Sequence, residues 1–221
     1  MSSSPMPTPN YDDAAVLGDR RTPSKGERQR QSILEALKDL LATRPIGELT
    51  VGEIATRARV QRSGYYFYFE SKYTALAVLT SDIWSELMDR AQSFVRFDNE
   101  SPVEFLIRAQ QASMEMWLTH DAVLVASVQA IPLDEQLAEM WKVWNERLAG
   151  LLAAQVLKDQ KRGAAKPVTT DVQGLISTLL EMTMHIFYED RLHNNTQDET
   201  RQMLDIVRRI WLASAWGITD P

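Results

Sequence analysis

The sequence is poor in the residues that support disulfide, metal or membrane chemistry. It contains no cysteine, only three histidines among 221 residues, and no apolar run close to the ~18–20 residues of a membrane-spanning helix. The absence of cysteine excludes disulfides and thiolate zinc sites and fits a reducing compartment. The N-terminus also lacks the basic segment and apolar core of a secretion signal. We therefore expect a cytoplasmic protein without a membrane segment, a metal or a cofactor.

Charge is distributed unevenly along the chain. The net charge is −6, but residues 19–72 carry eleven Lys and Arg against seven Asp and Glu, whereas residues 73–221 carry thirteen against twenty-one. A basic segment joined to an acidic body is typical of a nucleic-acid reader fused to another module. A chance fluctuation in surface charge would look the same, so charge alone does not decide the function.

Glycine and proline are also scarce, at nine each, and the segments between them have helical patterning. Helix starts are marked by a capping side chain followed three residues later by glutamate, or directly by proline: Ser24 and Glu27, Thr50 and Glu53, Thr196 and Glu199, and Ser101 before Pro102. Apolar spacing of three and four predicts helices over about residues 25–44, 51–58, 62–68, 72–94, 102–118, 121–130, 133–160, 170–192 and 197–216. No stretch alternates as a strand does, so we expect an all-α fold.

The stretch TVGEIATRARVQRSGYYFYF, residues 50–69, has the layout of a helix-turn-helix. A capped first helix is followed by a short turn and a second helix. In such a unit the second helix enters the major groove, where each base pair presents a distinct set of donors and acceptors. Arg62, Ser63 and Gly64 open this second helix, so we expect them to face base edges. Thr50, at the start of the first helix, is placed to bind a phosphate.

Aromatic residues make up only 8% of the chain, yet five of them stand together at residues 65–69. Tyr65 and Phe69 are four residues apart, share one face of the helix and are expected to pack inward. Tyr66 and Tyr68 point elsewhere, where a phenolic hydroxyl can donate to a phosphate, and Lys72 adds positive charge beside them. The alternative, that all five rings form the core of a small three-helix unit, stays open at this point.

The stretch VQRSGYYFYFESKYTAL resembles the recognition-helix signature of the TetR/AcrR family of transcriptional repressors. That signature has a small residue before a hydrophobic-Tyr-x-Tyr-Phe run, then Ser-Lys and a leucine, and the resemblance covers about residues 28–80. The family commonly has Gly where this chain has Arg59, Ser or Thr at Gln61, Thr or Ala at Gly64, and Pro at Glu70. The substitutions at Gln61 and Gly64 prevent the transfer of a base preference.

The Ser, Pro and Asp content of the N-terminus predicts a disordered arm over residues 1–22. The resemblance implies a three-helix DNA-binding domain over residues 23–72 and a larger helical ligand-binding and dimerisation domain over residues 73–221. The segments THDAVLVASVQA, LAEMWKVWNERLAGLLAAQ and IVRRIWLASAWG are similar to the EthR-type repressors, whose pocket is a long apolar channel with an aromatic lining.

Large, pliable apolar side chains recur on four of the later helices. Met and Trp together suit a flat or elongated hydrophobic ligand, although ordinary core packing explains any one of them. Asn145 and Thr183 are the polar residues expected to orient the ligand. The predicted ligand-binding residues are Met114, Trp117, Trp141, Trp144, Asn145, Leu148, Leu180, Thr183, Met184, Phe187 and Trp211.

Catalytic machinery is missing from the sequence. The three histidines lie on different segments, and Glu181 with His185 lacks the second histidine of a zinc-binding HExxH helix. There is no nucleophile elbow and no glycine-rich phosphate loop. We therefore predict that the protein is not an enzyme.

The last two helices carry apolar faces that predict the oligomeric state. These faces contain Leu175, Ile176, Leu179 and Ile186 on one helix and Met203, Ile206, Val207, Ile210 and Ser214 on the other. Two such helices from each of two chains close a symmetric four-helix interface, and this is also where the family dimerises. A two-fold homodimer in turn requires a palindromic site on DNA.

Together these features predict a ligand-responsive transcriptional repressor. It would bind a palindromic operator in double-stranded DNA as a homodimer and be released by a small hydrophobic effector. The alternative is a helical small-molecule-binding or carrier protein whose helix-turn-helix mediates protein contacts. A steep salt dependence of DNA binding distinguishes the two.

Overall fold

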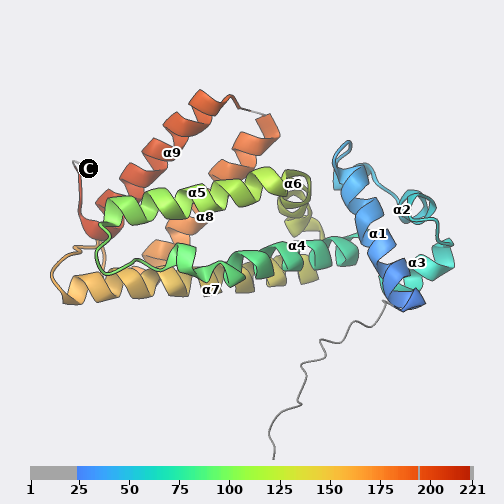
Figure 1. The fold of residues 1–221 in the computed structure, drawn as a ribbon, viewed down its shortest axis with the longest axis horizontal. Coiled ribbons are helices and arrows are strands. Elements are labelled where there is room, and N and C mark those ends of the chain that lie inside the picture. Colours follow the sequence, from blue (N-terminus) through green and yellow to red (C-terminus); the bar gives the residue numbers. More distant parts are fainter. Residues whose placement is uncertain (1–23, 194, 220–221) are drawn as a thin grey trace, which may run out of the picture.

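The computed structural model describes residues 24–193 and 195–219 (Figure 1). The predicted arm at residues 1–22 lies outside this range. Every regular element within it is helical, with no strand, as the sequence predicts. The helices are α1 (Lys25–Leu41), α2 (Val51–Arg57), α3 (Arg62–Tyr68), α4 (Lys72–Asp89), α5 (Pro102–Thr119), α6 (Asp121–Ala130), α7 (Glu135–Lys161), α8 (Val172–His193) and α9 (Gln197–Trp211), which continues as a π-helix over Leu212–Trp216.

Side-chain caps set the starts of these helices, as predicted. Complete capping boxes, in which each partner accepts from the other's backbone N–H, occur at Ser24 with Glu27, Thr50 with Glu53, Ser101 with Glu104 and Thr196 with Glu199. The sequence indicated only a cap followed by proline at Ser101, and the structure adds the answering carboxylate of Glu104. Each box satisfies backbone donors that the first helical turn leaves free.

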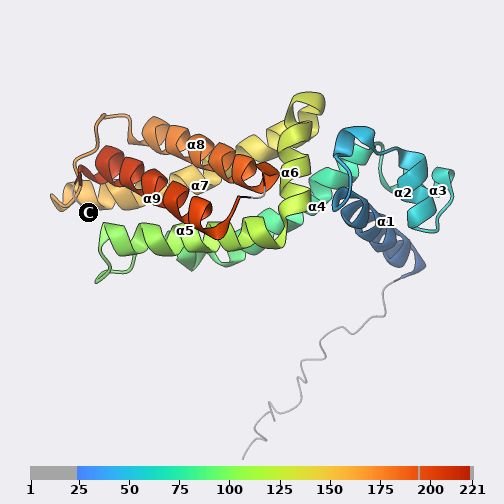
Figure 2. The ribbon, with the colours of Figure 1, turned by 90° about the horizontal axis from the view of Figure 1, so that it is seen from above.

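Helices α1, α2 and α3 form a compact unit at one end of the molecule (Figure 1). Its core consists of side chains that are entirely or almost entirely buried: Ile33, Leu34, Leu37, Ile46, Leu49, Ile54, Tyr65, Phe69 and Leu76. Helix α4 leaves this unit and runs directly into the larger body, so no flexible linker separates the two parts (Figure 2).

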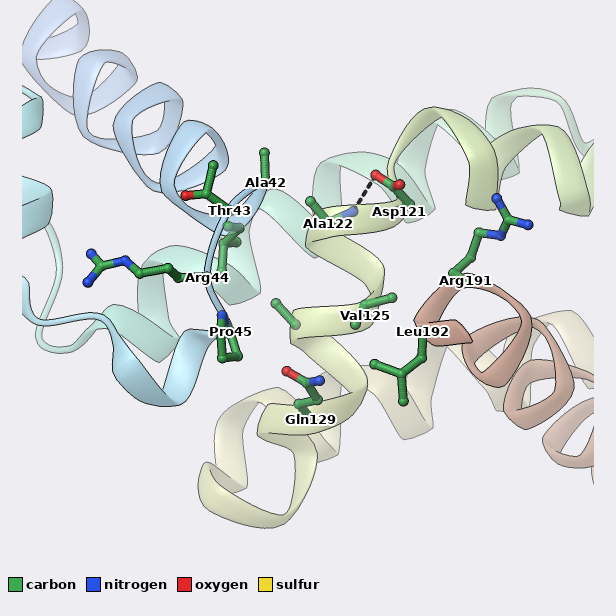
Figure 3. A pocket seen from close by; sticks show the side chains of 12 residues that line it. Ala42, Thr43, Arg44, Pro45, Asp121, Ala122, Val125, Gln129, Arg191 and Leu192 are labelled. Atoms are coloured by element: carbon green, nitrogen blue, oxygen red, sulfur yellow. Dashed lines mark hydrogen bonds between the residues drawn. The ribbon is translucent and has the colours of Figure 1, made fainter. Parts of the chain in front are cut away.

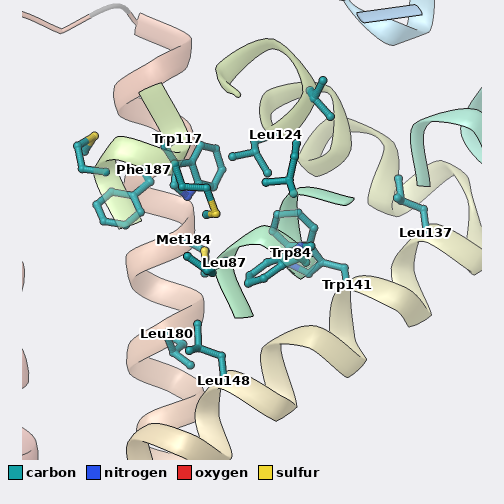
Figure 4. Close-up of a cluster of buried hydrophobic side chains, with 14 of the residues drawn as sticks. Trp84, Leu87, Trp117, Leu124, Leu137, Trp141, Leu148, Leu180, Met184 and Phe187 are labelled. Atoms are coloured by element: carbon teal, nitrogen blue, oxygen red, sulfur yellow. The ribbon is translucent and has the colours of Figure 1, made fainter. Parts of the chain in front are cut away.

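The body is built from α4 to α9 around a second apolar core. Tryptophans from different helices meet in this core (Figure 4). The Trp84 ring of α4 stacks on Trp144 at 6.2 Å and meets the edge of Trp141 at 5.6 Å. On the other side, Trp117 of α5 packs against Phe187 of α8 at 6.2 Å. These aromatic contacts hold α4 against α7 and α5 against α8.

Helix α6 is the element of the body, besides α4, that connects it to the N-terminal unit. It contacts α1 and the 3₁₀ turn Ile46–Glu48 on one side, and α4, α7 and α8 on the other. A buried pair of hydroxyls, 2.6 Å apart, joins Thr80 of α4 to Ser127 of α6. Helix α6 therefore contacts both the connecting helix α4 and the N-terminal unit.

In the described part of the chain no helix alone combines the length and apolarity that crossing a membrane requires. Only α5 taken together with Asp121–Leu133 meets that test, and these two segments are bent by 89° at their junction.

Candidate DNA-binding surface and ligand cavity

The surface of α3 presents an unusual set of side chains to solvent. Tyr65 and Phe69 are 0% and 2% exposed, as predicted. Tyr66 is 46% and Phe67 82% exposed. Arg62 lies at the start of the helix, also exposed. The five rings therefore do not form one core cluster, and the alternative that all five are buried is wrong.

Arg62 and Tyr66 form an ordered pair on this surface. The Arg62 guanidinium lies 5.7 Å from the centre of the Tyr66 ring, and its Nη2 is 3.4 Å from the Tyr66 hydroxyl. The i,i+4 spacing on one helical face produces this contact. Stacking restricts the guanidinium to a direction along the exposed face of α3, where its remaining N–H donors can bind base edges or phosphates.

Two of the residues predicted to bind phosphate also make internal hydrogen bonds. The Tyr68 hydroxyl donates to Gln29 Oε1 of α1 at 3.1 Å. The Lys72 ammonium donates to the carbonyls of Leu49 and Gly47 at 2.8 and 3.1 Å, which ties the start of α4 to the loop before α2. Partial burial lowers the pKa of Lys72. Phosphate binding by either group therefore competes with a bond that stabilises the unit.

The start of α2 already holds an anion from its own chain. The Glu53 carboxylate accepts from the Thr50 backbone N–H at 2.8 Å and from the Thr50 hydroxyl at 2.7 Å, and it pairs with Arg44 at 2.8 Å. The hydrogen bonds from Thr50 and then from Arg44 lower the Glu53 pKa to about 2. A phosphate at Thr50 would meet this carboxylate, so its room is limited to the backbone donors that Glu53 leaves free.

The body contains a narrow, partly open cavity between four helices and the turn at Ala91–Phe94. Its lining is apolar except for three side chains and comprises Phe94, Leu106, Ala109, Gln110, Ser113, Leu148, Leu152, Leu180, Thr183, Met184, Phe187 and Trp211. The free volume is only about 40 Å³, whereas pockets for drug-sized ligands measure ~300–1,000 Å³. A ligand of ordinary size must therefore separate the helices to enter.

The polar groups of this cavity differ in whether they have partners. The Thr183 hydroxyl donates to the Leu179 carbonyl at 2.7 Å and accepts from Trp211 Nε1 at 2.9 Å. Gln110 Nε2 donates to the Leu204 carbonyl of α9 at 3.1 Å, while Gln110 Oε1 is buried without a donor.

Comparison with known proteins agrees with both parts of this geometry. Residues 33–76 match the model of the bacterial regulatory proteins of the tetR family. Residues 107–217, just over half of the chain, match the model of the transcriptional regulator EthR C-terminal domain. The chain belongs to the TetR family of transcriptional regulators.

Relatives of this TetR-family chain align over almost its whole length. It is 26% identical over 215 residues to the HTH-type transcriptional regulator EthR of Mycobacterium tuberculosis H37Rv, covering 96% of this chain and 99% of that protein. The EthR of Mycolicibacterium smegmatis is 27% identical over 206 residues, covering 90% and 92%. The fatty acid degradation regulator FadR of Bacillus halodurans shares the fold, with a TM-score of 0.66 at 15% identity over 87% of this chain and 97% of that one.

Membership in the TetR family confirms several predictions. The all-α TetR-like fold, the similarity to EthR and the role in transcription regulation are confirmed, and the chain is a DNA-binding regulator rather than an enzyme. The alternative of a carrier protein is not favoured, because the related proteins are named as regulators or repressors of transcription.

The structure brings together only some of the predicted ligand-binding residues. Six of them line the cavity: Leu148, Leu180, Thr183, Met184, Phe187 and Trp211. Met114, Trp117 and Trp144 are absent from its lining, and Trp141 and Asn145 lie instead along a separate groove between α7 and α8. Trp141 and Trp144 are engaged with Trp84, which explains why their rings are not available to the cavity. Their role in ligand binding stays a prediction.

The sequence did not single out two residues, Phe67 on the surface of α3 and Gln110 in the cavity. Phe67 was not distinguished from the other rings, because its exposure depends on the angle of α3 against α1. Gln110 stands next to an identical residue, Gln111, and nothing in the local pattern tells which of the two faces inward. On any helix with a wide apolar face, the sequence pattern alone does not tell which of two neighbouring residues faces inward.

A cleft of about 590 Å³ separates the N-terminal unit from the body (Figure 3). The loop after α1, helix α6 and the end of α8 line it. Its charged side chains already have partners: Arg44 pairs with Glu53, Arg191 with Asp190, and Asp121 accepts from the Ala122 backbone. Two of its three charged side chains are thus in ion pairs, and the cleft offers room for the two parts to move relative to each other.

Titratable side chains do not converge on a metal site in the described residues, where no group of three or more His, Cys, Asp and Glu is placed to hold an ion. His185 and His193, expected on different segments, both lie on α8, where His185 makes a surface contact with Glu189 at 3.9 Å.

Proposed function

We propose that this TetR-family regulator is a repressor that binds a palindromic operator as a homodimer and releases it when a small hydrophobic effector enters the cavity. Residues 23–72 would form the DNA-binding domain and residues 73–221 the effector-binding and dimerisation domain, acting in the cytoplasm. The observation that carries the proposal is the exposed Arg62–Tyr66–Phe67 surface of α3, held on a core that continues through α4 into the body.

DNA recognition would divide along α3. Arg62, Ser63 and Gly64 would face base edges, with Arg62 supplying directional donors to a purine. Tyr66 would donate its hydroxyl to a phosphate. Tyr68 and Lys72 remain proposed phosphate contacts, reached only by exchanging their bonds to Gln29 and to the Leu49 carbonyl.

Homodimerisation is proposed through α8 and α9. Part of the predicted apolar faces is already used inside the protomer, since Ile176, Leu179 and Val207 are buried there. Ile206 and Ile210 of α9 remain 59% and 38% exposed. Their exposure on a helix at the edge of the body supports a second copy of the chain as the covering partner.

Release from DNA would follow from the small size of the cavity. Because only about 40 Å³ is free, an effector binds only a state in which the surrounding helices have moved apart. Helix α8 lines the cavity and contacts α6, which reaches the N-terminal unit. Binding would therefore favour a different spacing of the two recognition helices, as a shift in population between two states.

A gel-retardation assay with DNA from upstream of the protein's own gene tests the proposal. We expect retardation that weakens steeply as salt rises, because phosphate contacts release counterions. The Arg62→Ala variant should bind about tenfold more weakly and discriminate less between sequences, whereas Tyr66→Phe should weaken binding to all sequences alike. Arg147→Ala, which removes a charge from α7 far from α3, is the control and should bind normally. Absence of salt-dependent retardation would contradict the proposal.

A further inference from the structure

Gln110 carries an acceptor that folding leaves without a partner. The residue is 8% exposed, and its Oε1 atom is buried with no donor within hydrogen-bond distance. Leaving such an acceptor unpaired in the interior is costly, and native proteins rarely do so without a reason. A reason is present here, because Gln110 lines the cavity in which an effector is proposed to bind.

The orientation of this amide is fixed by the protein itself. The other end of the side chain, Nε2, is 3.1 Å from the Leu204 carbonyl of α9. A carbonyl only accepts, so the nitrogen must face Leu204, and turning the amide over would place two acceptors against each other. The oxygen is therefore the atom of this amide left without any partner, and it requires a hydrogen-bond donor.

The residues around Gln110 further limit the chemical class of ligand that the cavity can bind. Thr183 is already saturated by Leu179 and Trp211. Ser113 lies one turn after Gln110 along α5 and also lines the cavity, and among the described residues its hydroxyl makes no hydrogen bond. The remaining lining is apolar and carries no ionised side chain. Gln110 and Ser113 thus form one polar region on α5 within an otherwise largely apolar lining.

Gln110 also lies between two spaces. Besides the inner cavity it lines an outer groove of about 680 Å³ between α5 and α9, together with Ile107, Gln111 and Leu204. Gln110 is the residue that the two linings share, and its bond to the Leu204 carbonyl joins α5 to α9 there. An elongated molecule that extended from the groove into the cavity would pass Gln110.

We propose that the effector is a neutral, elongated apolar molecule with an N–H or O–H group, and that Gln110 Oε1 accepts a hydrogen bond from that group. This inference rests on the proposed function, since it assigns a ligand class to the same cavity. A carboxylate is disfavoured because it only accepts and would place an uncompensated charge among apolar side chains.

The test measures binding of matched probes by isothermal titration calorimetry. Octanamide donates two N–H bonds, N,N-dimethyloctanamide none, and octanoate is an anion. The wild-type protein should bind octanamide about tenfold or more tightly than either of the others, because they leave Oε1 unpaired. Equal binding of octanamide and its dimethyl analogue, or no binding by any of the three, would overturn the inference.

Two variants separate hydrogen bonding from steric fit. Gln110→Met keeps the length of the side chain and removes the acceptor, so the preference for octanamide over the dimethyl analogue should fall to about twofold or less. Gln136→Met, which changes an exposed glutamine at the start of α7 outside both the groove and the cavity, should keep the full preference. If Gln110→Met keeps it as well, the discrimination is steric and the inference is wrong. Should Gln110→Met not fold, 1-octanol against methyl octyl ether on the wild-type protein decides, with tighter binding of the alcohol expected.

The gel-retardation assay distinguishes a failure of this inference from a failure of the proposed function. A protein that binds DNA but shows no preference for donor-bearing probes contradicts the inference alone. A protein that fails to bind DNA contradicts the proposed repressor, while its calorimetric preference still decides the role of Gln110.

Discussion

Adjacent rings in α3 have different surroundings because a short helix turns by about 100° per residue. Tyr65 is buried and donates its hydroxyl to the Ser71 carbonyl at 3.0 Å, and burial raises the Tyr65 pKa, which keeps that donor protonated. Two residues later, Phe67 is 82% exposed. Burying a phenylalanine side chain contributes ~1.5–3 kcal/mol, so a bound partner that covered the Phe67 ring would gain a favourable contact.

The Phe67→Ala variant tests whether DNA is that partner. We expect the free energy of unfolding to change by less than ~0.5 kcal/mol, since the ring makes few contacts within the protein. DNA affinity should fall about tenfold, because the apolar contact with sugar or thymine methyl groups is lost. Chemical denaturation and retardation assays measure the two effects. A large loss of stability with unchanged DNA binding would show that Phe67 serves the fold instead.

Arg59 has a left-handed backbone conformation that usually belongs to glycine. Its φ is 57°, the only positive value at a non-glycine residue in the described range. The Val60 and Arg59 N–H groups donate to the carbonyls of Ala55 and Thr56 at 2.9 and 3.1 Å, which is the Schellman pattern that ends a helix with a residue in this conformation.

We expect Arg59→Gly to stabilise the protein by about 0.5 kcal/mol. Glycine removes the steric cost of the left-handed conformation, although its greater freedom in the unfolded chain offsets part of the gain. Arg59→Ala is the matched control: it removes the charge and keeps the Cβ atom, so it should bring no gain. Denaturant unfolding of both variants gives the comparison. An equal rise in stability for alanine would place the effect in the charge and not in the backbone.

At the scale of elements, local chemistry predicted helix starts better than helix ends. Every start marked by a capping side chain was found within two residues, because the cap and its glutamate act within one turn. The first helix, predicted to reach Arg44, ends at Leu41, and the N–H groups of Thr43 and Arg44 instead turn back to the Leu40 carbonyl. Helix α4, predicted to continue to Phe94, ends at Asp89.

Glu53 links the start of α2 to the pH dependence of stability. Its folded pKa is lowered to about 2 from an ordinary value of 4.5 by hydrogen bonds from Thr50 and Arg44. A lowered carboxyl pKa stabilises the fold above the unfolded value and loses this effect as pH falls through the folded value. The stability that Glu53 provides is therefore complete above about pH 4.5 and is lost toward pH 2.

The Glu53→Gln variant should accordingly be less stable than the wild type at neutral pH, and the difference should shrink as the pH is lowered toward about 2. Melting temperatures recorded across this range provide the measurement. Glu48→Gln, an exposed glutamate in the preceding turn, serves as control and should follow the wild-type curve. A constant gap between Glu53→Gln and the wild type at every pH would mean that the carboxylate is not the stabilising form.

Over the whole molecule, the position of the cavity was less accessible to sequence reasoning than the fold. Helical periodicity places Trp141 and Trp144 on the inner side of α7, but it does not say whether they meet a ligand or the Trp84 ring. That choice depends on how α4 packs between its neighbours, which involves residues about sixty positions apart. The division of α3 into buried and exposed side chains was easier to predict, because Arg62, Tyr65, Tyr66 and Phe69 lie within one short motif. Their contacts with DNA stay a prediction.

A buried carboxylate ties three distant segments of the body together. Asp159 of α7 is 1% exposed, pairs with Arg96 from the loop between α4 and α5, and accepts from Trp216 Nε1 at 2.9 Å near the C-terminus. Removing one partner of a buried ion pair leaves an uncompensated charge and costs ~3–5 kcal/mol. We therefore expect Asp159→Ala to lower the free energy of unfolding by about this amount.

The control for Asp159→Ala is Asp98→Ala. Asp98 also forms an ion pair across the chain, with Lys158 at 3.4 Å, but it is 79% exposed. Surface pairs of this kind contribute ~0–1 kcal/mol, so urea denaturation should find this variant close to the wild type. Similar losses for both variants would contradict a special role for the buried network.

At the scale of the assembly, a substitution at the exposed residue Ile210 tests the proposed homodimer. Ile210 of α9 is 38% exposed in the single chain. In a two-fold interface the residue meets the same surface of a second copy, so Ile210→Asp would bury two unpaired charges near the axis. We expect this variant to be monomeric by light scattering. It should also bind the operator at least tenfold more weakly, because each half-site is then bound alone.

Val143→Asp is the matched control for Ile210→Asp. Val143 is 52% exposed on α7, away from the proposed interface, so an aspartate there changes the charge equally without facing a second copy. This variant should keep the wild-type mass and DNA affinity. If Ile210→Asp stays dimeric, α9 does not form the interface and the second copy must meet another face. If the wild-type protein is itself monomeric, each chain binds DNA singly, and the structure no longer predicts a palindromic operator.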